Sequence, residues 1–402
     1  MPKNETKTGN VTRLSELRAR RRGKRIRNGI LVVVAAVFLL LYAMGAFGKS
    51  MAMLGDVLES ARISFQPGAG FPARTGVSDL IQVESLAGGF VELGKKEAVV
   101  FSSAGNQLRT LTHTYARPAI TAGNTRFAFY SRSGYELKVE SRSRTLYEHT
   151  YQQPIFFAEM SKGGSLAVVT GSSRYLAELI VYDIAFEEVY RWYPTEQEGM
   201  PTRIAFSVDG KRLAVSSLRS EEGSLSSQIH LLDLRKDEVQ QTIQLDGSSV
   251  MQLHWLDTRK LLIVCDNKAV VYDMNTAEQV AVYSYQGKQL TSASVSGRNL
   301  ALLLGADLEK MPAQLVILDA GMQIKAEQTI PSPSYGVVCT RSGAYVLRSR
   351  SVAAYDLQGV WQWEMELESQ PLAVLDTQKL LVFESGQVQQ LEENKEKDSF
   401  IG

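Results

Sequence analysis

The side chains best suited to chemistry are few and widely separated. The four histidines are His113, His149, His230 and His254, and none belongs to an HxH, HxxxH or HExxH pattern. Such spacings would place two zinc ligands on one face of a helix or strand. Without them, a zinc site is possible only if separate strands contribute its ligands. No nucleophile elbow, phosphate-binding loop or dinucleotide-binding glycine motif occurs. The sequence therefore predicts no catalytic residue, no metal ligand and no cofactor.

The two cysteines, Cys265 and Cys339, lie in different predicted strands. Neither has a CxxC partner or a neighbouring histidine that would lower its pKa. We interpret both as small buried side chains, rather than as a disulfide or a redox pair.

An acidic side chain recurs at the end of one strand-like run after another. With a serine at its first position, the series is Ser102, Glu140, Asp183, Asp233, Asp273, Asp319, Asp356 and Glu392. Acid catalysis or calcium binding is one interpretation. A regular position favours a structural role instead, because an Asp side chain can accept backbone N–H groups of the following turn.

Trp361 and Trp363 alternate in a predicted strand, with Tyr355 nearby. Aromatic side chains in this arrangement could stack on a sugar, or they could pack between neighbouring sheets. We favour packing.

These residues belong to a repeated unit of four short strands, which is clearest over residues 251–285. The acidic series recurs every 36 to 50 residues, about 41 on average, which is the period of a four-stranded propeller blade. Residues 256–262 (LDTRKLL) and 375–381 (LDTQKLL) differ at one position. The eight positions predict an all-β propeller of eight four-stranded blades over residues 77–393, with seven blades as the alternative.

Two segments carry a family resemblance. AFSVDGKRLAV, from Ala205 to Val215, resembles the first hairpin of tryptophan–aspartate (WD) repeat and TolB-type propellers. YDLQGVWQWEMEL, from Tyr355 to Leu367, is similar to the pyrroloquinoline-quinone-like (PQQ-like) propellers of bacteria. No blade carries a Trp-Asp dipeptide, and the vicinal cysteines of quinoprotein dehydrogenases are absent. The resemblance therefore implies the architecture and carries over neither cofactor nor redox activity.

The N-terminal region has a different composition. Residues 1–28 contain ten Lys or Arg and two Glu, and residues 30–47 are uncharged. A helix of this length rises roughly 27 Å, close to a hydrocarbon core of about 30 Å. We interpret residues 29–48 as an uncleaved transmembrane helix, with a cleaved signal peptide as the alternative. The cluster that would keep the N-terminus in the cytoplasm and export the propeller comprises Arg20, Arg21, Arg22, Lys24, Arg25 and Arg27.

The remaining segments complete the predicted domain organisation. Residues 49–76 are predicted to form a juxtamembrane helix and linker, and residues 394–402 a polar tail. The last blade lacks an outer strand, and residues 63–66 are the segment predicted to close it, since closure removes an exposed edge. The chain after residue 28 is net acidic, which argues against nucleic acid as a partner.

Taken together, these features predict a single-pass, extracytoplasmic propeller that binds a protein or a cell-envelope ligand. The alternative is a propeller enzyme, such as a hydrolase, lyase or quinoprotein, that uses the central channel. Binding residues are expected in loops. The candidates are three long insertions between second and third strands, from Gly171 to Ala177, from Arg219 to Ser227 and from Gly305 to Ala313.

Overall fold

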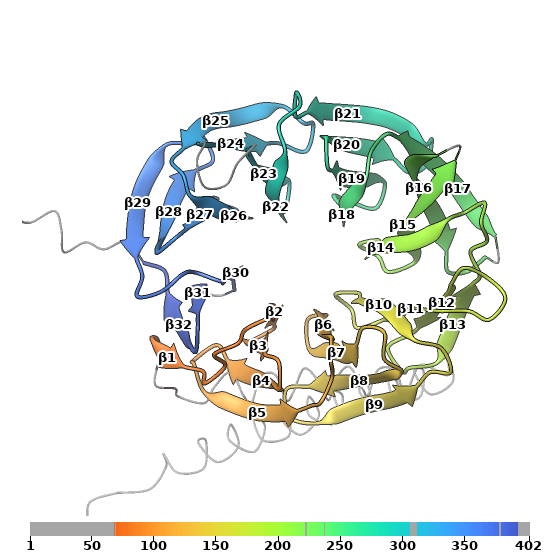
Figure 1. Cartoon of the computed structure of the whole chain (residues 1–402), viewed down its shortest axis with the longest axis horizontal. Coiled ribbons are helices and arrows are strands. Elements are labelled where there is room, and N and C mark those ends of the chain that lie inside the picture. Colours follow the sequence, from red (N-terminus) through yellow and green to blue (C-terminus); the bar gives the residue numbers. More distant parts are fainter. Residues whose placement is uncertain are drawn as a thin grey trace, which may run out of the picture. The chain divides into compact units, whose positions relative to one another are not determined.

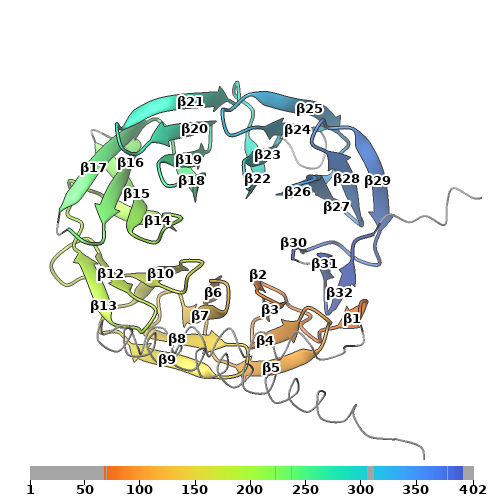
Figure 2. The ribbon, with the colours of Figure 1, turned by 180° about the vertical axis from the view of Figure 1, so that it is seen from behind.

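In a computed structural model of the full chain, eight four-stranded antiparallel sheets form a closed ring (Figure 1; Figure 2 shows the opposite side). The structure describes residues 68, 70–221, 223–236, 238–305, 312–377 and 379–392. The prediction of eight blades is confirmed. The predicted transmembrane helix lies outside the described residues. Within them, no helix is long and apolar enough to cross a membrane.

The first four blades follow the chain without a crossover. The first contains β2 (Gln82–Leu86), β3 (Gly89–Leu93), β4 (Glu97–Ser102) and β5 (Gln107–Thr112). The second contains β6 (Pro118–Ala122), β7 (Arg126–Ser131), β8 (Glu136–Ser141) and β9 (Thr145–Thr150). The third contains β10 (Ile155–Met160), β11 (Leu166–Thr170), β12 (Glu178–Tyr182) and β13 (Glu188–Trp192). The fourth contains β14 (Met200–Phe206), β15 (Arg212–Glu221), β16 (Ser224–Asp233) and β17 (Val239–Asp246).

The next three blades repeat this order, and the last one differs. The fifth contains β18 (Val250–Trp255), β19 (Lys260–Cys265), β20 (Lys268–Asp273) and β21 (Glu278–Ser284). The sixth contains β22 (Leu290–Ser296), β23 (Asn299–Leu304), β24 (Ala313–Leu318) and β25 (Ile324–Ile330). The seventh contains β26 (Ser334–Cys339), β27 (Gly343–Arg348), β28 (Ser351–Asp356) and β29 (Trp361–Glu366). The eighth joins β30 (Ala373–Asp376), β31 (Leu380–Glu384) and β32 (Gln387–Gln390) to β1 (Ala73–Arg74).

The ring is closed from the N-terminal side, but by a different segment from the one predicted. Ala73 pairs with Val388 and Arg74 with Gln387, so β1 is the outer strand of the eighth blade. Residues 63–66, predicted for this position, lie outside the described residues. Ala73 and the preceding Phe71 pack against the apolar cluster that Phe383 and Val388 form with the first blade. This packing selects the closing strand, and residues 73–74 therefore belong to the propeller rather than to a linker.

The core is a ring of eight apolar clusters, one between each pair of neighbouring blades. Each middle strand is covered on both faces, so its side chains are apolar without alternation. In β11 all five residues are buried, and in β19 the five residues after Lys260 are buried. This explains the uninterrupted apolar runs in the sequence.

The inner strands of neighbouring blades are joined by side chains rather than by backbone pairing. The Gln82 side chain donates to the Ile120 carbonyl at 2.8 Å. The Gln252 side chain donates to the Ala293 carbonyl at 3.1 Å. The N–H of Cys339 donates to the Ser294 hydroxyl at 2.9 Å. These bonds satisfy backbone groups at sheet edges that would otherwise lack partners.

The recurring aspartates stabilise turns, which confirms the structural interpretation for these members of the series. Asp356 Oδ1 accepts the N–H groups of Gln358 and Val360, each at 2.9 Å. Asp183 and Asp319 accept the N–H groups two and four residues after them in the same way. The Ser102 hydroxyl accepts the N–H groups of Ala104 and Asn106. From Ser102 to Asp356 the series therefore marks the turn between the third and fourth strands of a blade. Glu140 instead accepts from the side chains of Arg109 and Thr145, and Glu392 marks no such turn, because the fourth strand of its blade is β1.

Candidate ligand-binding site

A short motif is repeated at the ends of the first two outer strands. His113-Thr114-Tyr115 follows β5 and His149-Thr150-Tyr151 ends β9, and in both a proline stands three residues after the tyrosine. Each motif lies beside a pocket between its own blade and the next one. The repeat is visible in the sequence, but it lies outside the apolar runs that define the strands, so the strand pattern alone does not reveal it.

The first of these pockets, here called the first wedge, has a volume of about 380 Å³. Its lining includes Arg109, His113, Tyr115, Phe129, Glu136, Lys138 and Glu140. The rings of Tyr115 and Phe129 lie 5.0 Å apart. The Tyr115 N–H donates to His113 Nδ1 at 3.2 Å, so His113 carries its proton on Nε2, which lies 3.2 Å from the Gly94 carbonyl. Burial lowers the pKa of His113, and this histidine is therefore a neutral structural group.

The second wedge is larger, about 850 Å³, and more aromatic. Its lining includes His149, Tyr151, Arg174, Tyr175, Glu178, Tyr182, Phe186, Glu188, Arg191 and Tyr193. The His149 ring stacks on Tyr147 at 5.9 Å and meets Tyr151 edge-on at 4.4 Å. Unlike His113, it makes no hydrogen bond to another described residue. At the mouth, the rings of Tyr175 and Tyr193 lie 5.0 Å apart.

A charged network lies along the mouth of the second wedge. Arg191 forms ion pairs with Glu178 on the neighbouring strand β12 and with Glu188 on its own strand. The hydrogen bond from Arg191 lowers the pKa of Glu188. Arg174 lies over the Tyr175 ring, 5.5 Å from its centre. These planar groups present donors and acceptors beside two partly exposed aromatic rings.

One of the three predicted binding loops takes part in this site. Ser172 to Tyr175, from the predicted loop between Gly171 and Ala177, line the second wedge. In every blade the turn between the second and third strands and the end of the fourth strand lie at the same edge of the sheet, because the strands alternate in direction. The predicted loops and the His-Thr-Tyr ends of both wedges therefore share one face of the ring, here called the wedge face, and both wedges extend from it along the strands.

The second predicted loop is a strand extension. β15 and β16 pair without a break, from Arg212 with Asp233 to Glu221 with Ser224, so the segment from Arg219 to Ser227 is the end of a long hairpin. Leu225 near its tip is 57% exposed. In the third loop, from Gly305 to Ala313, the ends flank β23 and β24, and residues 306–311 lie outside the described residues.

A buried serine–histidine pair occurs in the fourth blade. His230 Nε2 lies 2.8 Å from the Ser217 hydroxyl and 3.0 Å from the Glu198 carbonyl, and its Nδ1 lies 3.1 Å from the Thr242 hydroxyl. Ser217 is 0% exposed and His230 is 1% exposed. Because no substrate can reach the hydroxyl, this arrangement is a satisfied internal network rather than a nucleophile and its base.

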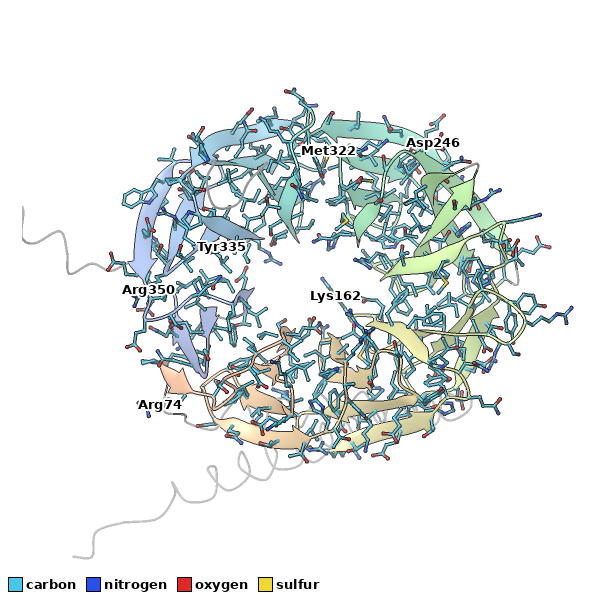
Figure 3. All side chains as sticks on the ribbon, viewed as in Figure 1. Arg74, Lys162, Asp246, Met322, Tyr335 and Arg350 are labelled. Carbon is cyan, nitrogen blue, oxygen red and sulfur yellow. The ribbon has the colours of Figure 1, made fainter. Side chains whose placement is uncertain are left out.

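The inner strands carry ionisable groups that are kept neutral. Burial raises the pKa of Glu159 on β10 to about 8, and the charge of Glu84 on β2 adds to this shift. Burial also lowers the pKa of His254 to about 4, with a further contribution from Lys162. Lys162 extends from the turn after β10 towards the centre of the ring (Figure 3). Glu84, Glu159 and His254 are contributed by three different blades, and no hydrogen bond joins them. Within the described residues, no group of three or more His, Cys, Asp or Glu could hold a metal ion.

The cysteines and tryptophans give one confirmation and one correction. Cys265 and Cys339 are free and buried, as interpreted. Trp363 packs into the cluster between the seventh and eighth blades. Trp361, however, is 56% exposed, so the prediction that both tryptophans pack between blades is wrong for this residue. Trp363 pairs with Ala354 and Trp361 with Tyr355, so Gln362 forms a bulge between the two tryptophans, and they do not share one face of the sheet.

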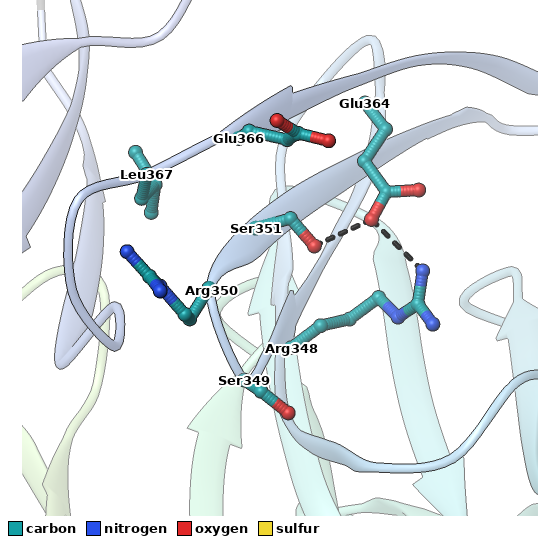
Figure 4. Close-up of a pocket in the computed structure, with 7 residues that line it drawn as sticks. All are labelled: Arg348, Ser349, Arg350, Ser351, Glu364, Glu366 and Leu367. Atoms are coloured by element: carbon teal, nitrogen blue, oxygen red, sulfur yellow. Dashed lines mark hydrogen bonds and ion pairs between the residues drawn. The ribbon is translucent and has the colours of Figure 1, made fainter.

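A third pocket on the wedge face lies in the seventh blade and has a volume of about 470 Å³ (Figure 4). Arg348 Nη1 donates to Glu364 at 2.8 Å, and the Ser351 hydroxyl bonds to the same carboxylate. Arg350 Nη2 donates to the Glu368 carbonyl at 2.7 Å. This pocket contains charged groups like those of the two wedges, but its lining includes no aromatic ring.

Comparison with known proteins places the propeller in a family. Residues 73–392 match the model of the "Family of unknown function (DUF5711)". A curated relative is the zinc chaperone AztD of Citrobacter koseri, 29% identical over 111 residues, which are 26% of this chain and 25% of that protein. The match therefore spans about a quarter of the length of that relative.

Solved structures share the fold at low sequence identity. BamB from Moraxella catarrhalis superposes with a TM-score of 0.55 at 13% identity, over 79% of this chain and 98% of that chain. Sqt1 from Saccharomyces cerevisiae superposes with a TM-score of 0.58 at 12% identity, and the superposition covers 82% of this chain and 100% of that chain. Apo AztD from Citrobacter koseri superposes with a TM-score of 0.51 at 11% identity, and the superposition covers 73% of this chain and 87% of that chain. At these identities the likeness shows the propeller architecture alone.

Proposed function

This chain belongs to the DUF5711 family, and we propose that it is a membrane-anchored, extracytoplasmic binding module whose ligand surface is formed by the two wedges. The ligand is a cell-envelope component or a protein on the outer side of the membrane. An N-terminal topology signal in the sequence and two pockets in the structure support this role.

The observation that carries the proposal is the presence of two equivalent wedges side by side. Both adjoin the second blade, and both combine a His-Thr-Tyr motif with aromatic rings and charged side chains. Concave sites with aromatic walls and a few placed polar groups are typical of ligand binding. Two neighbouring copies suit an extended ligand, because contacts at both sites multiply the effective affinity.

Binding is favoured over catalysis by the chemistry of these residues. His113 is held by two hydrogen bonds in its neutral form, and the Ser217–His230 pair is closed to substrate. The match to the zinc chaperone AztD covers about a quarter of each chain, and the described residues contain no cluster of three metal-binding side chains, so they do not favour zinc as the ligand.

The membrane part of the proposal rests on the N-terminal sequence. The basic cluster from Arg20 to Arg27 precedes the uncharged residues 30–47, and this order predicts a cytoplasmic N-terminus. Protease added to spheroplasts should digest the propeller and leave an N-terminal tag intact, whereas permeabilised cells should lose both. Protection of the propeller in intact spheroplasts would contradict this topology.

The binding function is tested with the full chain purified from membranes in detergent. Isolated cell-envelope fragments are incubated with the protein and sedimented, and bound protein is measured. Replacing the two tyrosines at the mouth, Tyr175→Ala with Tyr193→Ala, should reduce sedimentation at least tenfold. Trp361→Ala is the matched control, because it removes an exposed aromatic side chain that lines neither wedge.

Two results would overturn the binding proposal. Equal sedimentation of the double variant and the control would place the ligand surface elsewhere, for example at the hairpin from Arg219 to Ser227 or the loop from Gly305 to Ala313. Chemical change of the envelope fragments during incubation, such as release of soluble products, would replace binding by the enzymatic alternative.

A further inference from the structure

The two wedges are electrically balanced, which restricts the ligand. Each is lined by two basic and two acidic side chains. In the first wedge they are Arg109, Lys138, Glu136 and Glu140. In the second wedge they are Arg174, Arg191, Glu178 and Glu188. A site for a polyanion or a polycation would carry an excess of the opposite charge, so the balance points to a neutral ligand.

Polar groups in the second wedge keep hydrogen-bonding capacity for a ligand. Tyr151 is 7% exposed and lines the wedge, and its hydroxyl has the Tyr182 hydroxyl as its neighbour. The half-exposed His149 ring is bounded by Tyr147 and Tyr151, and neither ring nitrogen is bonded to a described residue. A phenol oxygen and an imidazole nitrogen can each make a further hydrogen bond, which a ligand that carries hydroxyl groups would supply.

The inner wall of the second wedge offers side chains rather than backbone groups. β12 is paired on one side with β11 and on the other with β13, so its backbone groups are already used. The outer strands β9 and β13 each have one edge without a partner strand, and a peptide that binds by strand addition would use such an edge rather than the pocket itself. Within the pocket, the groups available for recognition are aromatic rings, carboxylates and guanidinium groups.

Aromatic and planar polar groups occur together at the mouth. The rings of Tyr175 and Tyr193 lie 5.0 Å apart at an angle of 35°. Arg191 reaches both Glu178 and Glu188 beside them. A pyranose has an apolar face of C–H groups that packs on an aromatic ring, and a rim of neighbouring hydroxyls that planar bidentate groups can bond.

From these observations we propose that the wedges bind a neutral glycan chain, one segment in each wedge. Sugar rings stack on Tyr175 and Tyr193 in the second wedge, and their hydroxyls bond to Arg191, Glu178 and the Tyr151 hydroxyl. The first wedge repeats this arrangement on a smaller scale around Tyr115. The inference rests on the proposed binding function, since it assigns the ligand class of the same surface.

The test uses the full chain in a polyoxyethylene detergent, which has no sugar headgroup to compete. The probes are immobilised neutral oligosaccharides of the cello, malto, xylo and chito series, with an acidic polysaccharide and a neutral peptide as comparisons. We expect saturable binding to at least one neutral series, changing less than twofold between 50 mM and 500 mM salt because no ion pair is formed with the ligand.

Variants assign the binding to the wedges. Tyr175→Ala with Tyr193→Ala should weaken binding about tenfold or more through lost stacking, and Arg191→Gln about fivefold through lost charged hydrogen bonds. Arg350→Gln, in the pocket without aromatic rings, should stay within twofold of the unmodified chain. Melting temperatures within a few degrees of the unmodified chain show that each variant is folded.

The possible results separate the ligand class from the function. If envelope fragments are captured through the wedges but no neutral oligosaccharide binds, the proposed function stands and the glycan inference is wrong. Binding only to the acidic polysaccharide or only to the peptide overturns the inference in the same way. If oligosaccharide binding is unchanged in all wedge variants, the assignment of the glycan site to the wedges is wrong.

Discussion

The backbone N–H of Thr75 donates a 3.0 Å hydrogen bond to the carbonyl of Gly386, and this bond ties the start of the propeller to its last hairpin. The N–H of Gly386 in turn donates to the carbonyl of Val77 at 3.0 Å. Together with the two residue pairs of β1 and β32, these bonds close the ring. A propeller whose last blade lost this strand would expose an edge and the apolar cluster behind it.

The first prediction concerns this closure. Thr75→Pro removes the donor to Gly386 and leaves that carbonyl without its partner, so the free energy of unfolding should fall by on the order of 1 to 3 kcal/mol. Thermal unfolding of the full chain in detergent micelles measures the change. The control, Arg74→Ala, alters the exposed side chain of the preceding residue, at the end of β1, and should change the melting temperature little. Equal melting temperatures for Thr75→Pro and the unmodified chain would show that closure does not limit stability.

The second prediction concerns a buried carboxyl behind the closing strand. Glu92 on β3 is 1% exposed, and one of its carboxyl oxygens has no hydrogen-bond partner among the described residues. Burial raises the pKa of Glu92 to about 7, which the neighbouring Thr75 hydroxyl offsets only in part. Because the folded state holds this proton more tightly than the unfolded state, stability should fall as pH rises from about 4.5 to about 7.

Glu92→Gln should remove this contribution to the pH dependence. At pH 8 the variant should be more stable than the unmodified chain by on the order of 1 to 3 kcal/mol, and at pH 5 the two should be nearly equal. Unfolding at both pH values gives the comparison. A stability difference that is the same at pH 5 and pH 8 would contradict the assignment of this titration to Glu92.

The third prediction concerns the two thiols. Burial raises the pKa of Cys265 to about 12 and that of Cys339 to about 11. Since the thiolate is the reactive form, a thiol reagent at pH 8 should leave the native protein unlabelled. After unfolding in denaturant, both cysteines should react. Rapid labelling of the native chain, or only one reactive thiol after unfolding, would contradict their interpretation as inert buried side chains.

The fourth prediction concerns the acidic turn residues. Asp356→Ala removes the acceptor for the N–H groups of Gln358 and Val360, and it should reduce the free energy of unfolding by about 1 kcal/mol. Asp356→Asn keeps an acceptor oxygen in the same place, and its free energy of unfolding should fall by less than half as much as that of Asp356→Ala. Denaturant unfolding of the two variants distinguishes them, and an equal loss for both would contradict a role as hydrogen-bond acceptor.

The sequence was sufficient for features that are encoded within one blade. The four-strand repeat, the apolar middle strands and the acidic residue after the third strand all recur at a fixed place in each unit. Each of them depends on contacts between residues that are close in the chain or on burial from both sides. Blade number, the role of Asp183, Asp319 and Asp356, and burial of the two cysteines could therefore be predicted.

Only the tertiary structure determined features that depend on two separate segments meeting. The closing strand is Ala73–Arg74 because these residues pair with β32 and pack beside Phe383, and nothing local distinguishes them from residues 63–66. The segment from Arg219 to Ser227 is a paired hairpin because its two halves match in register, which its polar composition did not indicate. The wedges arise where the outer part of one blade faces the next blade. His149 and Arg191 belong to strands of different blades, and they line the same pocket only because these blades pack side by side. Local sequence specifies the strands and turns of a blade, whereas the packing of blades around the ring specifies which side chains meet and therefore where a ligand can bind.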